Sequence, residues 1–146
     1  MRTSASYLVR RKSEILLDPT PRVPIATESQ EQCAFVQWWA AQHMRWGLPE
    51  FALYAVPNGG KRHKAVAGQL KGEGVRKGIQ DMNLDVPRGT HHGLRIEMKS
   101  RCRAARVRPD QAEVHKFLRS QGYVVAVCRG AEEAMSVIRA YLGPTS

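Results

Sequence analysis

Apolar residues along the chain recur with two different periods, and the segments between them are rich in glycine, proline and charged residues. A spacing of three and four residues is typical of an amphipathic helix, whereas a short continuous apolar run is typical of a buried strand. The patterns predict strands over residues 51–56, 81–86, 94–98 and 123–128, and helices over 27–46, 109–122 and 131–142, with another ending near 71. The order α-β-α-β-β-α-β-α predicts an α/β domain with a central mixed sheet flanked by helices.

The first predicted helix has the clearest boundaries. Thr27 is a good N-cap residue, the acids Glu28 and Glu31 follow in the first turn, where the helix dipole favours them, and Gly47 is the expected stop. Its apolar face is expected to contain Cys33, Val36 and Ala40, with Phe35 and Trp39 beside it. The tryptophans are expected to serve core or dimer packing, namely Trp38, Trp39 and Trp46.

Residues 1–26 contrast with this domain, since they mix serine, proline and basic residues around one short apolar run. They predict a flexible basic arm in front of a domain over residues 27–146. No run approaches the roughly 20 apolar residues that a membrane span needs, and charged residues interrupt any N-terminal signal core. Three widely spaced cysteines suit a reducing cytoplasm, bacterial or of a phage-infected host cell, with Cys33 and Cys128 expected to be buried.

The net charge gives information about the binding partner. Lysine and arginine total 23 against 13 acids, which gives a net charge of +10. Such an excess attracts polyanions. The excess is uneven: residues 57–80 carry six basic residues against one acid, and residues 81–110 carry seven against four. The acids Asp81 and Glu97 lie inside this basic stretch, which indicates phosphate binding around a metal site.

The candidate chemistry lies in Asp81 and in the run Glu97-Met98-Lys99, which are joined by a predicted hairpin. Because side chains alternate across a strand, Glu97 and Lys99 are expected on one face, with Ile96 and Met98 on the other. An acid beside a lysine can be a surface ion pair worth about 0–1 kcal/mol. Two carboxylates that converge from neighbouring strands instead make an oxygen site suited to Mg²⁺, and Lys99 could then assist an attacking water.

Basic and glycine-rich segments flank these residues and are expected to contact the phosphate backbone of a nucleic acid. Backbone N–H groups and cations at a helix start are suited to bind phosphate. The residues concerned are Asn58, Gly59, Gly60, Lys61, Arg62, Lys64, Arg76 and Lys77, together with Arg101 and Arg103 on the loop after Lys99. A solvated charged loop is the alternative for that last segment, where Arg106 and Arg108 also lie. His91 and His92 are expected in a turn, not among metal ligands.

Taken together, four motifs resemble the VRR-Nuc family, the virus-type replication-repair branch of the PD-(D/E)xK nucleases. They are the run from Val56 to Arg62, the glycine-rich segment 72–78 before Asp81, the run Glu97-Met98-Lys99, and Pro109-Asp110-Gln111. The resemblance covers residues 27–142 and implies a restriction-endonuclease-like fold. One departure is Gln80, which stands where the superfamily has a proline before the aspartate.

The resemblance also implies the site and its chemistry. It implies Mg²⁺-dependent hydrolysis of phosphodiester bonds in DNA, with Mn²⁺ able to substitute. Asp81, Glu97 and Lys99 match the nuclease motif, Gln111 a supporting glutamine, and Glu28 the helix-borne glutamate, with Glu31 as the alternative. The expected metal ligands are Glu28, Asp81, Glu97 and the backbone carbonyl of Met98.

Small stand-alone members resemble Holliday-junction resolvases and act as homodimers, so the expected function is a structure-specific DNA endonuclease in repair or recombination. A two-fold dimer suits the two symmetric cuts that a four-way junction requires. The main alternative is a non-catalytic DNA-binding module that keeps the fold, and a scaffold in which Glu97 and Lys99 form only an ion pair is a second. No membrane partner is expected.

Overall fold

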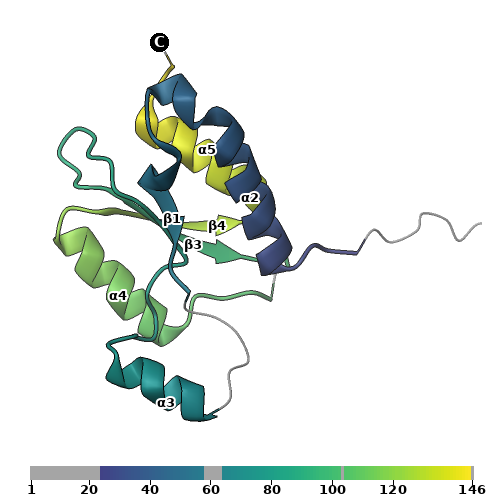
Figure 1. Ribbon diagram of the computed structural model, residues 1–146, viewed down its shortest axis with the longest axis vertical. Helices are drawn as coiled ribbons and strands as arrows, with labels where there is room; N and C mark the ends of the chain where they lie inside the picture. The colour runs from purple at the N-terminus through teal and green to yellow at the C-terminus, as the bar shows by residue number, and fades with distance from the viewer. Residues whose placement is uncertain (1–23, 58–63, 103, 146) are drawn as a thin grey trace, which may run out of the picture.

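The computed structural model describes residues 24–57, 64–102 and 104–145, which form a mixed sheet with helices on both of its faces (Figure 1). In chain order the helices and strands are α2 (Glu28–Gln42), β1 (Leu53–Ala55), α3 (Lys64–Gly72), β2 (Met82–Leu84), β3 (Leu94–Lys99), α4 (Pro109–Ser120), β4 (Val124–Arg129) and α5 (Ala131–Leu142). Two short 3₁₀ helices, His43–Trp46 and Glu50–Ala52, connect α2 to β1. The predicted element order and the α/β fold class are confirmed.

The sheet has four strands in the order β1-β2-β3-β4. The first three are antiparallel, and Met82 lies opposite Ile96, so β2 and β3 form the predicted hairpin. The last pair, β3 and β4, is parallel, with Met98 opposite Cys128. Parallel neighbours need a crossover connection, and α4 supplies it.

The two faces of the sheet carry different helices. Helices α2 and α5 pack against each other and against β3, while α4 packs against β4 from the other side (Figure 1). The core between α2, α5 and the sheet is apolar and includes Phe35, Trp39, Leu84, Ile96 and Ile138. Because this face is filled with apolar side chains, the polar residues of β3 lie on the α4 side.

The buried stripe of α2 differs from the predicted one. Its buried residues are Glu31, Phe35 and Trp39, spaced four apart, whereas Cys33 and Val36 are exposed. Cys33 is two residues from both Glu31 and Phe35, which is roughly 200° around the helix and therefore the solvent side. The expectation of a buried Cys33 was wrong because the buried stripe includes a charged residue. Cys128 is buried as predicted.

The helix boundaries follow local chemistry. The Thr27 hydroxyl accepts a hydrogen bond from the N–H of Gln30, whose side chain accepts one from the Thr27 N–H, a reciprocal cap. At the other end Gly47 adopts a positive φ of 65°, which ends the 3₁₀ turn as the sequence predicts. The tryptophans serve packing: Trp39 is buried, and Trp38 and Trp46 pack against the core.

The predicted buried strand over residues 51–56 is shorter than expected. Phe51 lies in a 3₁₀ turn and is 80% exposed, and only Leu53–Ala55 pairs with β2. Because β1 is an edge strand, it has a partner on one side only. Among the described helices none is long and apolar enough to cross a bilayer. Most of the predicted arm, and residues 58–62 and Arg103, lie outside the described residues.

Candidate active site

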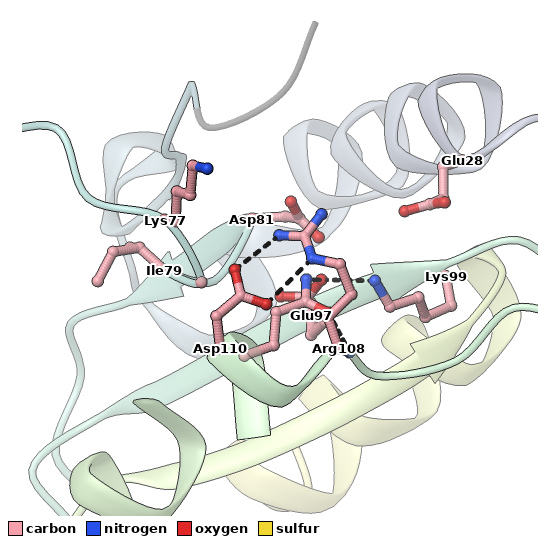
Figure 2. A pocket seen from close by; sticks show the side chains of 10 residues that line it. Glu28, Lys77, Ile79, Asp81, Glu97, Lys99, Arg108 and Asp110 are labelled. Atoms are coloured by element: carbon pink, nitrogen blue, oxygen red, sulfur yellow. Dashed lines mark hydrogen bonds and ion pairs between the residues drawn. The ribbon is translucent and has the colours of Figure 1, made fainter. Parts of the chain in front are cut away.

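A cleft of about 580 Å³ opens where β2, β3 and the first turn of α4 meet (Figure 2). Ten residues line it, and most of them are charged or polar. They are Glu28, Lys77, Gly78, Ile79, Asp81, Glu97, Lys99, Arg108, Asp110 and Gln111. All five predicted catalytic residues are among them.

Asp81 immediately precedes β2, and the hairpin brings it beside β3. Its Oδ2 accepts a hydrogen bond of 2.7 Å from the backbone N–H of Met98. The Met98 side chain belongs to the core on the opposite face, so β3 presents Glu97 and Lys99 to the cleft while Met98 anchors the strand. The alternation that the sequence predicts for β3 is confirmed.

Glu97 is the most enclosed acid of the cleft, with 1% of its surface exposed. Its Oε1 accepts hydrogen bonds from Lys99 Nζ, at 2.9 Å, and from the Gln111 side-chain amide. Its Oε2 is buried and has no hydrogen-bond partner among the described residues. A buried carboxylate oxygen without a partner is energetically costly, so this oxygen is a candidate ligand for a cation.

Burial raises the pKa of both acids of the pair. For Asp81 the hydrogen bond from Met98 and the charges of Lys99 and Arg108 oppose that rise in pKa. For Glu97 the hydrogen bond from Lys99 opposes the rise in pKa, while the nearby charges of Asp81 and Glu28 add to it. Asp81 and Glu28 thus repel the Glu97 carboxylate in a partly desolvated site, and a bound cation would relieve this repulsion.

Glu28 and Glu31 lie one turn apart on α2 and have different surroundings. Glu28 is exposed and lines the cleft. Glu31 is buried: its Oε2 accepts a hydrogen bond of 2.8 Å from the backbone N–H of Ala131, and its Oε1 pairs with Arg101 Nε at 2.8 Å. Both oxygens of Glu31 are therefore already engaged, and Glu28 is the helix-borne acid that lines the cleft.

The first turn of α4 connects the far wall of the cleft to the acid pair. Gln111 accepts a hydrogen bond of 3.0 Å from the Arg108 N–H through Oε1 and donates to Glu97 through Nε2. Gly78 has a φ of +80°, and a Cβ there would lie 2.7 Å from the backbone oxygen of Asp110. Only glycine lets the segment with Lys77 approach α4 this closely.

The predicted DNA contacts are only partly near the cleft. Lys77 lines it, whereas Arg76 lies outside its lining and donates to the Lys71 carbonyl. Arg101 pairs with Glu31 instead of lining the cleft. Lys64 begins α3. The predictions for Asn58, Gly59, Gly60, Lys61, Arg62 and Arg103 concern residues outside those that the structure describes.

Two further residues, Arg108 and Asp110, line the cleft beside the predicted catalytic residues. The sequence predicts Arg108 as one of four loop arginines that contact substrate phosphates, with a solvated loop as the alternative, and it predicts Asp110 as part of a motif without a role of its own. Their position follows from Pro109, which starts α4 and so fixes both residues at the helix N-terminus beside the cleft. The proline was the available signal, but the direction of α4 relative to β3 is a tertiary property.

The acids suit a hard cation, although no three His, Cys, Asp or Glu side chains converge as a metal cluster among the described residues. Mg²⁺ is usually held by one or two carboxylates plus waters and carbonyl groups, so it does not require such a cluster. Glu97 Oε2, which has no partner among residues 24–57, 64–102 and 104–145, lies beside the partly buried Asp81 and fits this requirement.

Comparisons with known proteins agree with this architecture. The sheet, its helices and the acid–acid–lysine cleft define an α/β domain with a nuclease fold. A solved structure titled "VRR_NUC domain protein" superposes with a TM-score of 0.70 and 30% sequence identity, covering 85% of this chain and 96% of that one. The chain therefore belongs to the VRR-Nuc family. No family model and no curated protein matches the sequence.

Proposed function

We propose that this chain is a Mg²⁺-dependent DNA endonuclease, with Mn²⁺ able to replace Mg²⁺. The observation that carries the proposal is the buried Glu97 side chain beside Asp81. One of its oxygens pairs with Lys99, and the other has no partner within the part of the chain that the structure describes. A module that only bound DNA would gain nothing from desolvated carboxylates at a phosphate-binding surface. Membership of a nuclease family supports the same conclusion.

Asp81 and Glu97 would hold the metal ion, with the Met98 carbonyl as a backbone ligand and Glu28 as a further acid. When bound, Mg²⁺ lowers the pKa of water and neutralises charge that develops on the phosphate. The orientation of Glu97 is fixed by the chain itself, because Lys99 and Gln111 both donate to its Oε1. Gln111 thereby leaves the second oxygen of Glu97 available.

Lys99 would act on the attacking water and on the phosphate. Its side chain is 9% exposed and its ammonium lies in the wall of the cleft, held by Glu97. From this position Nζ can orient the attacking water by a hydrogen bond, assist the transfer of its proton, and stabilise negative charge on the phosphate. A lysine can be buried at this position because the acids of the cleft and the phosphate of the substrate are negatively charged.

The substrate is proposed to be DNA, bound first through its backbone. The net charge of +10 favours a polyanion, and Lys77 at the cleft would contact a phosphate. Lys64, Arg76, Arg101 and the segment 58–62 with Arg103 are proposed to extend this contact. A branched substrate such as a four-way junction, cut by a homodimer, is the more specific proposal, because two symmetric cuts need two symmetric sites.

The test is cleavage of labelled four-way junction, flap, single-stranded and linear duplex DNA in Mg²⁺ and in Mn²⁺. The wild-type chain is compared with Asp81→Asn, Lys99→Ala and the surface control Lys116→Ala. We expect the first two variants to bind DNA and not to cut it, and the control to behave as wild type.

The outcome also separates the candidate functions. Cleavage of a junction in preference to the other substrates would support the resolvase proposal, and cleavage of another substrate would keep the chemistry and change the role. Binding without cleavage of any substrate in either metal would contradict the proposal and favour a DNA-binding module.

A further inference from the structure

Arg108, the residue before α4, is a cation at the cleft to which the proposed chemistry assigns no role. It lines the cleft together with Asp81, Glu97 and Lys99. Its side chain is 62% exposed, so a ligand that enters from solvent can reach it. Its charge is felt inside the site, because it opposes the rise in the pKa of Asp81 that burial causes.

Within the described residues, the Arg108 guanidinium is held along one edge. Its Nε lies 3.2 Å from Oδ1 of Asp110 and its Nη2 lies 3.3 Å from Oδ2, the two contacts marked in Figure 2. A guanidinium has five N–H donors in a rigid plane, and this fork uses two of them. The Nη1 group and the second proton of Nη2 form the other edge, which has the spacing for a phosphate.

The base of the Arg108 side chain is fixed relative to the acid pair. The Arg108 N–H donates to Gln111, and Gln111 donates to Glu97. Asp110 is fixed as well, because its backbone packs against Gly78 without room for a Cβ. An exposed ion pair contributes little to stability, so the main effect of the Arg108–Asp110 pair is to set the direction of the guanidinium.

We propose that Arg108 binds a phosphate of the DNA strand in the cleft and that Asp110 is its positioning residue. The inference rests on the proposed function, since it takes DNA as the ligand. Asp110 holds one edge of the guanidinium, and the phosphate binds the opposite edge through paired N–H donors. Holding the side chain in place beforehand reduces the entropy lost when the phosphate binds.

The first measurement is DNA affinity as a function of salt, with Ca²⁺ in place of Mg²⁺ and the DNA checked to be intact afterwards. Each phosphate contact adds about 0.9 to the slope of log K against log salt for duplex DNA. We expect Arg108→Gln to lower this slope by about 0.9. The control is Arg45→Gln, an identical charge change in the 3₁₀ helix at the other end of α2, which should leave the slope unchanged. If Arg108→Gln and Arg45→Gln gave the same slope of log K against log salt, the proposal that Arg108 contacts a phosphate would be overturned.

The second measurement tests the role of Asp110. Asp110→Asn raises the net charge by one, so electrostatics alone would tighten DNA binding. We expect it to weaken binding instead, whereas Glu113→Gln, the same charge change on the exposed side of α4, should not. The double variant Asp110→Asn with Arg108→Gln should bind DNA no worse than Arg108→Gln alone. Both substitutions act on the same contact, the one between Arg108 and the phosphate. Tighter binding by Asp110→Asn, matching Glu113→Gln, would overturn the positioning role.

These measurements remain informative whatever the nuclease assay gives. They read DNA binding and its salt slope, not cleavage, and thermal unfolding of each variant checks that the fold is kept. If wild type binds DNA but cuts nothing, the proposed function fails while the Arg108 slope is still measured. If wild type cuts DNA and the Arg108→Gln slope is unchanged, only the further inference fails.

Discussion

Two buried glutamates, Glu31 on α2 and Glu97 on β3, are almost equally hidden from solvent, with 5% and 1% of their surfaces exposed. Their carboxylates are used differently. Both oxygens of Glu31 have partners, the N–H of Ala131 and the guanidinium of Arg101. Glu97 receives two donors on one oxygen and none, among the described residues, on the other.

The different partners of the two carboxylates indicate different reasons for their burial. Glu31 joins three parts of the fold: helix α2, the loop after β3 through Arg101, and the first residue of α5. Its negative charge is favoured there because a helix N-terminus carries partial positive charge. Glu97 instead belongs to a cleft where burial, and then the charges of Asp81 and Glu28, raise its pKa, which is typical of a functional site.

The largest effect is expected from Lys99→Met, which keeps the aliphatic packing and removes the charge. Loss of a group that handles protons in the transition state lowers a rate by about 10²–10⁴-fold. We therefore expect DNA cleavage to fall by that factor with little change in DNA affinity. Single-turnover cleavage with saturating protein measures it, and a Lys99→Met protein that cuts at the wild-type rate would remove Lys99 from the mechanism.

At Glu31 we expect the effect on stability, not on chemistry. Glu31→Ala leaves the buried N–H of Ala131 without its acceptor, which costs about 1–3 kcal/mol. Glu31→Gln keeps an acceptor and loses the ion pair with the exposed Arg101, so it should cost less. Urea denaturation gives both values. Equal stability of wild type and Glu31→Ala would show that the contact between α2 and α5 does not hold the fold.

At the edge of the cleft, Gly78→Ala should be more harmful than Gly74→Ala. Both glycines have positive φ, +80° and +99°, so both substitutions strain the backbone by about 1–2 kcal/mol. Only at Gly78 would the new Cβ meet the backbone of Asp110, whereas nothing lies within 4 Å at Gly74. We expect the Gly78 variant to be the less stable of the two in thermal unfolding and also to lose DNA affinity.

The smallest effect has the opposite sign. Asp81→Asn should stabilise the metal-free protein by about 0.5–2 kcal/mol at neutral pH, because active-site strain is often removed in this way. Burial raises the pKa of Asp81 above its ordinary value of 3.8, so the folded state binds the proton more tightly than the unfolded chain. That contribution is complete below pH 3.8 and is lost as pH rises through the raised pKa.

The advantage of Asp81→Asn should therefore grow as pH rises above 3.8 and then level off. Urea denaturation of wild type and Asp81→Asn across this range measures it, and Glu113→Gln at the surface of α4 is the control. A difference that stays constant with pH would mean that burial does not perturb the Asp81 carboxyl.

The sequence was informative where the structure depends on local patterns. Alternation along β3 correctly predicted that Glu97 and Lys99 share a face, and the hairpin correctly brought Asp81 beside them. The element order followed from apolar periodicity, and Pro109 correctly marked the start of α4. These features depend on residues close in sequence, which is why a single chain predicts them.

Features that depend on distant contacts could not be predicted. The choice between Glu28 and Glu31 depends on the N-terminus of α5, which lies 100 residues after Glu31. The same contact buries the charged Glu31 in α2. A prediction based on apolar residues alone therefore chose the wrong face of the helix and expected Cys33 to be buried. The Arg108–Asp110 pair is local in sequence, but its position at the cleft depends on how α4 crosses the sheet.

We propose that the Asp81–Glu97 cleft serves catalysis and that the Glu31 contacts serve the fold. The most direct test measures DNA cleavage in Mg²⁺ and unfolding in urea for wild type, Asp81→Asn and Glu31→Gln, two neutralisations of matched size. We predict crossed results: Asp81→Asn loses cleavage by at least about 10²-fold and gains stability, while Glu31→Gln loses stability and still cuts below its melting temperature. Full cleavage by Asp81→Asn, or parallel losses in both variants, would contradict the account.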